Sequence, residues 1–373
     1  MNNSNPHQHM TSRERVLTAL AHRQPDRAPF NLGFGLQPPA MLDFMQYMGI
    51  GGLAETEDFL LSLADMRNIS PDYIGPVDMV KTDNDGTVNC IWGVKRKPVS
   101  YGAGSYDEIS YYPLADATDI SDLQNYPWPS ADWYDFGNYK DKLIRSGRNA
   151  ETGNRYAVYT GIANVFEASW YMRGFERMFM DLIDAPEFAW ELMSRVTDYF
   201  IGYFTKLLQS ADGMVDIVFT ADDIGSQEGL LMSLPMWEKL VKPHHIRINK
   251  ALHEFGVKIM YHTDGAVMDA VPSLIGMGID ILEALQFDAK GMDPATLKDC
   301  YGDRLCFHGG ISVQHTLPYG SEGDVRTEVA QMLDVLGKDG GYIVAPAHAI
   351  QAGTPAANIA AFLSAATTRV IRR

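Results

Sequence analysis

The sequence has few cysteines, no long apolar run and fewer basic than acidic side chains. Three cysteines, Cys90, Cys300 and Cys306, are too few for a disulfide framework and are typical of a protein in the reducing cytoplasm. No apolar run reaches the length of about 18 residues that a membrane span needs. The 31 basic residues against 47 acidic ones give a net charge of −16, which argues against nucleic acid or an anionic membrane as partner.

What the chain does contain is typical of a globular protein. Hydrophobic residues make up 46% of the 373 positions, which is enough for a large core. This length allows two or three domains, or one α/β barrel. The start of the chain, MNNSNPHQHM, is polar and lacks the apolar stretch of a secretory signal. We therefore predict a flexible tail over 1–10 and a single domain over 11–373.

Short apolar segments alternate with amphipathic helical patterns along most of the chain. The first helix follows Thr11, with Glu14 placed to complete a capping box. Expected strands lie at 28–33, 72–80, 157–162, 216–223, 258–265, 281–286, 306–311 and 342–347. Expected helices lie at 175–183, 187–208, 236–255, 266–277 and 324–337. Strands alternating with helices indicate a parallel sheet, and eight of them predict a (β/α)8 TIM barrel.

The region 81–135 interrupts this alternation. It is polar, rich in Tyr, Trp, Asp and Gly, and has no helical periodicity. Asp85-Gly86 is a favourable turn for a β-hairpin. We expect an inserted β-hairpin region in a barrel loop, where tyrosines such as Tyr101 and Tyr106 could shape the mouth of the barrel.

Polar side chains stand at the ends of several expected strands, where barrel enzymes place their active residues. His262 and Asp264 are two positions apart, so they share a face of an extended strand. His308 and His348 come from later strands and could converge on the same mouth. Imidazole and carboxylate groups suit Zn²⁺ or a similar ion. The alternative is a histidine–carboxylate hydrogen bond that satisfies both groups.

Two acidic positions allow both a catalytic and a structural interpretation. Asp222 and Asp223 point to opposite faces if the strand continues, so one could face the barrel axis as a base while the other caps the following helix. Glu167 could form a helix ion pair with Arg173, or face inward as a site residue.

Small residues of the seventh expected strand are also ambiguous. Gly309-Gly310 could let a bound cofactor approach the backbone, or could only make a tight turn. Cys306 could be a soft metal ligand, although a small buried residue is the commoner role.

The chain resembles the uroporphyrinogen decarboxylase family, which includes porphyrinogen decarboxylases and cobalamin-linked methyltransferases. The resemblance runs from about Arg13 to Ile359 and rests on segments such as SRERVLTALAHRQPDRAPF, DDIGSQEGLLMSLPMWEKLVKPHH, YHTDGAVMDAVPSLIGMGIDILEALQ and GGYIVAPAHAIQAGTPAANI. It implies a (β/α)8 barrel, in agreement with the strand count.

The resemblance favours the methyltransferase branch. The decarboxylases carry an arginine-rich segment after the first strand, but here 31–42, NLGFGLQPPAML, contains no arginine. The zinc methyltransferases use a His-x-Cys pair and a distant Cys, which align with His262, Asp264 and His348. The resemblance therefore implies a metal site in which a carboxylate and an imidazole replace two thiolates, giving a harder, more Lewis-acidic set.

Three functions follow from these observations. The first is a cytoplasmic methyltransferase that moves a methyl group between a small O- or N-methylated substrate and a corrinoid carried by a partner protein, with Zn²⁺ on His262, Asp264 and His348, or with Asp222 or His308 as proton donor. The second is a metal-free decarboxylase or lyase that uses Asp222 or Asp223 and His348. The third is a non-catalytic subunit of a methyl-transfer complex. A homodimer is expected because symmetric pairs are the commonest oligomers.

Overall fold

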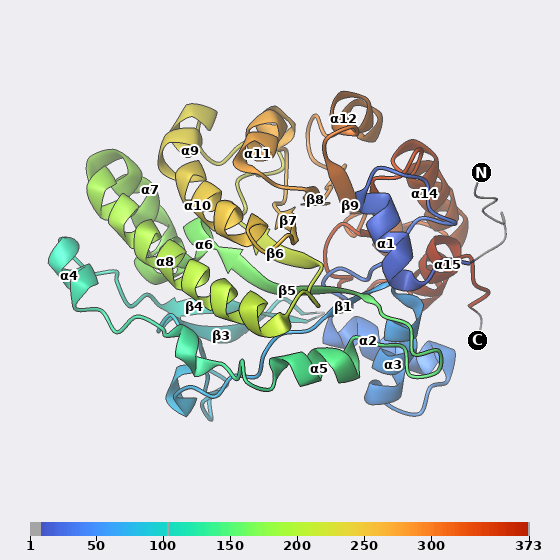
Figure 1. The fold of residues 1–373 in the computed structure, drawn as a ribbon, viewed down its shortest axis with the longest axis horizontal. Coiled ribbons are helices and arrows are strands. Elements are labelled where there is room, and N and C mark those ends of the chain that lie inside the picture. The colour runs from blue at the N-terminus through green and yellow to red at the C-terminus, as the bar shows by residue number, and fades with distance from the viewer. Residues whose placement is uncertain (1–8, 103, 372–373) are drawn as a thin grey trace.

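The computed structural model describes residues 9–102 and 104–371, and its centre is a curled parallel sheet surrounded by helices (Figure 1). The sheet has seven strands in the order β1-β5-β6-β7-β8-β9-β10. Their bounds are β1 Met66–Asn68, β5 Ala157–Asn164, β6 Ile217–Ala221, β7 Lys258–His262, β8 Ile281–Ala284, β9 Cys306–Ile311 and β10 Tyr342–Pro346.

The two edges of this sheet are joined by the chain around Phe30. Phe30 forms a parallel bridge with Val344 of β10. On its other side, the Phe30 carbonyl accepts a hydrogen bond of 2.8 Å from the amide of Asp65, just before β1. This short segment takes the place of the first barrel strand, so the predicted (β/α)8 architecture is confirmed.

The strand expected at 72–80 was wrongly predicted. The second barrel strand is β1, whereas 72–80 is a surface connection with one 3₁₀ turn at Val77–Met79. Its apolar residues Ile74 and Val77 are 64% and 75% exposed, so they do not belong to the core. Pro76 within this segment lacks the amide that a central strand needs. β1 could not be predicted from the sequence pattern because its three residues, MRN, contain only one apolar side chain.

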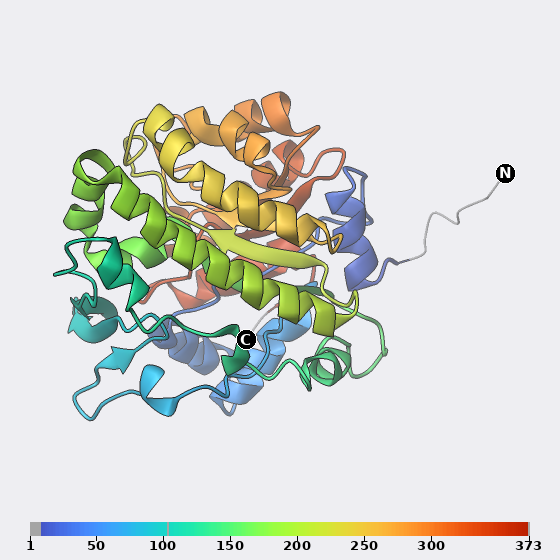
Figure 2. The same cartoon turned by 60° about the vertical axis from the view of Figure 1, so that its left-hand side comes forward.

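Helices cover the outside of the sheet, and Figure 2 shows α8 and α10 side by side in this layer. The predicted helix 236–255 is two helices because Pro243 begins a new one after Val241. The helix bounds after the first segment are α2 Pro38–Met48 and α3 Leu53–Leu63, and after β5 they are α6 Val165–Arg173, α7 Phe175–Asp184 and α8 Pro186–Ala211. The remaining helices are α9 Leu234–Leu240, α10 Lys242–His253, α11 Val271–Met277, α12 Pro294–Tyr301, α13 Thr316–Tyr319, α14 Glu322–Val335 and α15 Ala356–Thr367.

The amino end of the barrel is closed by α1, Ser12–Leu20, which begins with the predicted capping box of Thr11 and Glu14. Val16 and Leu20 of this helix belong to a cluster with buried residues from every strand of the sheet: Met66, Ala157, Ile217, Phe219, Met260, Ile281, Cys306 and Ile343. This end of the barrel is therefore a packed core that leaves the opposite end for the site.

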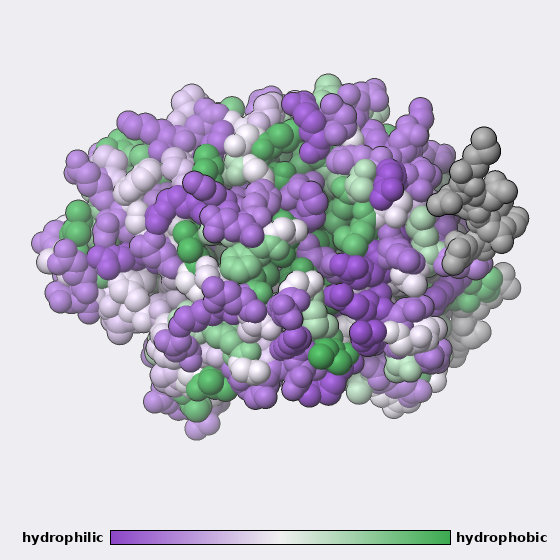
Figure 3. Space-filling view, viewed as in Figure 1, coloured by the Kyte–Doolittle hydropathy of each residue, from purple (hydrophilic) through white to green (hydrophobic). Residues whose placement is uncertain are grey.

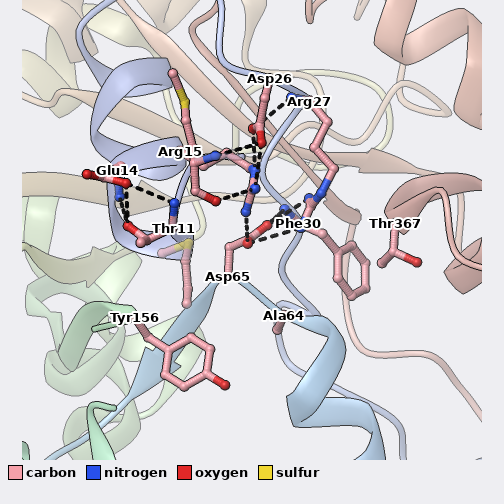
Figure 4. Close-up of polar contacts among 12 residues, drawn as sticks. Thr11, Glu14, Arg15, Asp26, Arg27, Phe30, Ala64, Asp65, Tyr156 and Thr367 are labelled. Carbon is pink, nitrogen blue, oxygen red and sulfur yellow. Dashed lines mark hydrogen bonds and ion pairs between the residues drawn. The ribbon is translucent and has the colours of Figure 1, made fainter. Parts of the chain in front are cut away.

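A network of ion pairs lies beside α1 (Figure 4). Asp65, which is 1% exposed, forms ion pairs with Arg15 at 2.7 Å and with Arg27 at 2.8 Å. Arg15 also binds Asp26 at 2.6 Å, and the amide of Phe30 donates to Asp65 at 2.9 Å. These bonds attach the first barrel segment to α1 and to β1.

The inserted region is antiparallel, as predicted, but its strand pairs turn elsewhere than at Asp85-Gly86, which closes only an isolated bridge between Thr82 and Val88. β2 Val88–Asn89, β3 Lys95–Ser100 and β4 Ser105–Tyr111 form a separate antiparallel sheet. Gly86 adopts a φ of 83° in the turn before β2, which only glycine adopts at little cost. Helices α4 Ile120–Gln124 and α5 Tyr139–Ser146 follow. The Tyr106 hydroxyl of β4 donates to Gln351 at 3.2 Å, so the insertion contacts the loop after β10.

Hydrophilic side chains make up much of the surface visible in Figure 3. On the face seen in Figure 3, hydrophobic residues lie in small groups among hydrophilic ones. Among the described residues, no helix combines the length and apolarity needed to cross a membrane. Of the predicted tail, 1–8 lie outside the described residues, whereas the amide of Met10 donates to Asp26 at 3.0 Å.

Candidate active site and metal centre

Three polar side chains form a row across adjacent strands at the carboxyl end of the barrel. The strand register pairs His262 with Glu283, and Glu283 with His308. Residues paired in register share a face. Met260, Ile281 and Cys306 lie two positions earlier and face the barrel interior, so the row lies directly above the apolar core.

Glu283 is the centre of this row. His262 Nδ1 donates to Glu283 Oε2, and His308 Nδ1 lies 3.6 Å from Oε1. Burial alone would raise the pKa of Glu283, but the charge of His262 and their hydrogen bond outweigh it and lower this pKa to about 2. Burial disfavours protonation of His262, yet Glu283 and the nearby Asp264 and Asp223 raise its pKa to about 10. The site therefore stabilises a positive charge on this imidazole.

His262, Asp264 and His348 together could hold a metal ion. One ligand atom from each lies within 4.8 Å of the others. Since Nδ1–H of His262 donates to Glu283, Nε2 is the nitrogen that can bind a metal once it has released its proton, and this carboxylate–histidine arrangement is common in metal sites. Asp223 Oδ1 lies 3.6 Å from Nε2 and accepts a hydrogen bond of 2.9 Å from the backbone amide of Asp264, which orients both residues. The fit is good because the excess carboxylate charge would be neutralised by a divalent cation.

A cavity of about 1470 Å³ extends from this row into the side of the barrel. It reaches Glu283 and His308, and its wall includes Phe34, Phe219 and Tyr159. The Phe34 ring lies 5.1 Å from the His262 ring and 4.9 Å from the His348 ring, centre to centre. Phe34 is a site residue that was not predicted, although its position between two glycines, Gly33 and Gly35, which both adopt positive φ, marks an unusual loop.

The two neighbouring aspartates have different environments. Asp223 is 40% exposed in its side chain and faces the mouth. Asp222 is fully buried and accepts the amides of Phe166 and Glu167, each at 2.8 Å. Asp222 is thus a helix cap, as one interpretation expected, but it caps α6, which precedes β6 in the chain.

Glu167 lies near this mouth, at the third position of α6. Burial and the charges of Asp222 and Asp223 raise its pKa to about 7, and the Tyr171 hydroxyl donates to it at 2.9 Å. The alternative ion pair with Arg173 is not formed, because Arg173 binds Asp181 at 2.6 Å. A carboxyl group with this pKa can both donate and accept a proton near neutral pH.

The glycine and cysteine candidates lie in tightly packed surroundings. A Cβ on Gly309 would come within 2.1 Å of the Ala284 carbonyl, and one on Gly310 would come within 3.1 Å of the Phe287 ring. Strand packing therefore explains why both positions are glycine. That these glycines bind a cofactor stays a prediction. Cys306 faces the amino end near α1, and burial raises its pKa to about 12, so it lies apart from the candidate metal site.

Comparison with solved structures includes a match over nearly the full length. A methyltransferase from Methanosarcina mazei aligns over 96% of this chain and 99% of its own, with a TM-score of 0.66 and 16% identity. The 3-keto-D-glucoside 4-epimerase of E. coli covers 69% of this chain and 94% of its own, at 11% identity, and a D-psicose 3-epimerase of Clostridium cellulolyticum covers 61% and 72%, also at 11%. Their TM-scores of 0.38 and 0.34 are too low to bear on the fold.

Sequence comparison gives the family. No curated protein matches the sequence. A family model described as uroporphyrinogen decarboxylase matches residues 116–369, which is more than half of the chain and includes β5 to β10. The chain belongs to the uroporphyrinogen decarboxylase family.

Proposed function

We propose that this protein is a methyltransferase that moves a methyl group between a small O- or N-methylated substrate and a corrinoid carried by a partner protein. The observation that carries the proposal is the His262, Asp264 and His348 group, in which His262 is oriented by Glu283, a residue that also lines a large cavity. The full-length likeness to a protein described as a methyltransferase supports it.

The donor set fits a divalent metal such as Zn²⁺, with His262 Nε2, an Asp264 oxygen and a His348 nitrogen as ligands. When bound, this metal supplies Lewis acidity toward the heteroatom that carries the methyl group. The corrinoid, when presented by its carrier, supplies the cobalt that exchanges the methyl group.

The chain's own residues would control the proton and the water. As the bond between methyl carbon and heteroatom breaks, the carboxyl of Glu167 donates its proton to that heteroatom, and in the reverse direction its carboxylate accepts it. A pKa of about 7 makes both forms available at neutral pH. Phe34 covers the rings of His262 and His348 and excludes water from that side.

A metal-free decarboxylase is the second candidate. The observation in its favour is the Glu283–His262 pair, which holds a proton on His262 in the absence of a cation. A protonated imidazole could bind a substrate carboxylate. The candidate is weaker because segment 31–42, which lines part of the cavity, contains no arginine, so a polyanionic tetrapyrrole would depend on arginines elsewhere in the lining, such as Arg67 and Arg148.

Metal analysis of chelator-free protein separates these functions. We expect about one zinc per chain in the wild type, and none in a folded His262→Ala, His348→Ala double variant. His253→Ala, on the exposed side of α10, is the matched control and should keep the metal. Methylated phenols and amines would then be screened with reduced corrinoid.

Three other outcomes would count against the proposal. Wild-type protein without metal affinity would remove the metal-assisted mechanism. Carbon dioxide release from an aromatic acid, without methyl transfer, would support the decarboxylase. Turnover of a methyl-transfer complex that is unchanged by the double variant would indicate a non-catalytic subunit.

A further inference from the structure

A buried pair of side chains lies behind the mouth of the barrel, on the side of α10. His245 Nε2 lies 2.5 Å from Asp222 Oδ2, and both side chains are completely buried. The His245 ring also packs edge-on against Tyr261 of β7, at 5.3 Å between centres. Because Nε2 donates to the carboxylate, the imidazole holds Asp222 in one orientation.

Asp222 in turn holds the start of α6. The N-cap residue of this helix, Asn164, makes no side-chain capping bond. The two free amides that a local cap would satisfy, those of Phe166 and Glu167, donate to Asp222 instead. A carboxylate from the next barrel strand thus caps α6, and His245 supplies its third hydrogen bond.

We propose that His245 is a positioning residue for Glu167. It fixes Asp222, Asp222 fixes the first turn of α6, and this turn carries Glu167 beside the mouth of the barrel. Tyr171, one turn later in α6, holds the Glu167 carboxyl by its hydroxyl, so the orientation of the whole helix sets where the proton is delivered. The role in catalysis rests on the methyl transfer proposed above, whereas the positioning does not.

The neighbouring His244 provides an internal comparison. It is equally buried on the same helix, but it packs against Trp190, and neither of its ring nitrogens has a hydrogen-bond partner among the described residues. Burial and the adjacent His245 and Arg247 lower its pKa to about 3, so it is a neutral packing group. A substitution there changes the same helix without reaching α6.

The test compares two amide side chains at position 245. In His245→Gln the amide nitrogen reaches the place of Nε2 and can donate to Asp222, whereas the shorter side chain of His245→Asn cannot reach it. In His245→Asn, we expect the rate of amide hydrogen exchange in the first turn of α6 to rise about tenfold or more. This rate is measured by mass spectrometry on folded protein. His245→Gln and the control His244→Asn should exchange in this turn like the wild type.

Equal exchange in His245→Asn and His245→Gln would overturn the proposal. If His245→Asn does not fold, the same comparison is made with His245→Met, which keeps the bulk and lacks the donor. Once a substrate is known, we expect kcat of the variant without the donor to fall on the order of 100-fold with little change in KM. Altered exchange in a protein without methyl transfer would leave the positioning intact and refute only the proposed function.

Discussion

The two ends of the barrel both bury charged side chains, but they neutralise them differently. At the amino end, every carboxylate of the network faces a guanidinium: Asp26 binds Arg15, and Asp65 binds Arg15 and Arg27. At the mouth, Asp223 and Glu283 face imidazoles, with His262 as their shared partner. The amino end is therefore electrically satisfied, whereas the mouth has spare negative charge.

The difference separates charges that stabilise the fold from charges that perform chemistry. An arginine stays protonated at any accessible pH, so its pairs are fixed. An imidazole can release its proton and bind a metal ion through the same nitrogen. We therefore interpret the amino end as structural and the mouth as the reactive end, and three substitutions can test this contrast.

The largest effect is expected at the amino end. Asp65→Asn leaves Arg27 without a carboxylate partner and the buried Arg15 with Asp26 alone, so we expect a loss of about 3 kcal/mol in the free energy of unfolding, measured in urea. Asp212→Asn, which removes the exposed ion pair with Lys140, should cost less than about 1 kcal/mol. Equal losses in the two variants would contradict the structural role of the network.

A smaller effect is expected at the mouth. Glu283→Gln keeps a hydrogen-bonding group beside His262 but removes the carboxylate charge. We therefore expect the affinity for Zn²⁺, measured by competition with a chelating dye, to fall about 10- to 100-fold. The loss of stability should be smaller than for Asp65→Asn, because His262 can release its proton. Asp65→Asn should bind Zn²⁺ like the wild type, and weaker binding there would show that the two ends are coupled.

The smallest effect is expected for Glu167, and it is a gain in stability instead of a loss. The pKa of Glu167 is raised from 4.5 to about 7 in the folded protein. Its protonated form is thus favoured by folding, and the contribution to stability is complete below pH 4.5 and lost as the pH rises through 7. Glu167→Gln, which cannot ionise, should exceed the wild type by about 1–2 kcal/mol at pH 8 and match it more closely at pH 5.

Denaturation at several pH values measures this difference. Glu187→Gln, at the exposed start of α8, is the control and should leave the pH dependence unchanged. A Glu167→Gln protein that is less stable than the wild type at pH 8 would show that the ionised carboxylate stabilises the fold, and the contrast between the two ends would then fail.

Most of the barrel could be predicted from the sequence because it depends on local patterns. The buried strands of the second half each contain a short apolar run, and Thr11 with Glu14 forms the expected capping box. The exception, β1, is a three-residue strand containing Arg67, and no periodicity can reveal so short a segment. The spacing of His262 and Asp264 likewise placed both residues at the end of one strand.

Only the tertiary structure decided how these residues meet. The register between β7, β8 and β9 aligns His262, Glu283 and His308, and register depends on contacts between segments that are distant in sequence. For the same reason, Asp222 caps a helix that lies more than fifty residues before it, and His245 supports it from a helix that follows. The sequence by itself determined which residues stand at strand ends, whereas folding determined which of them share a hydrogen bond and which face the mouth.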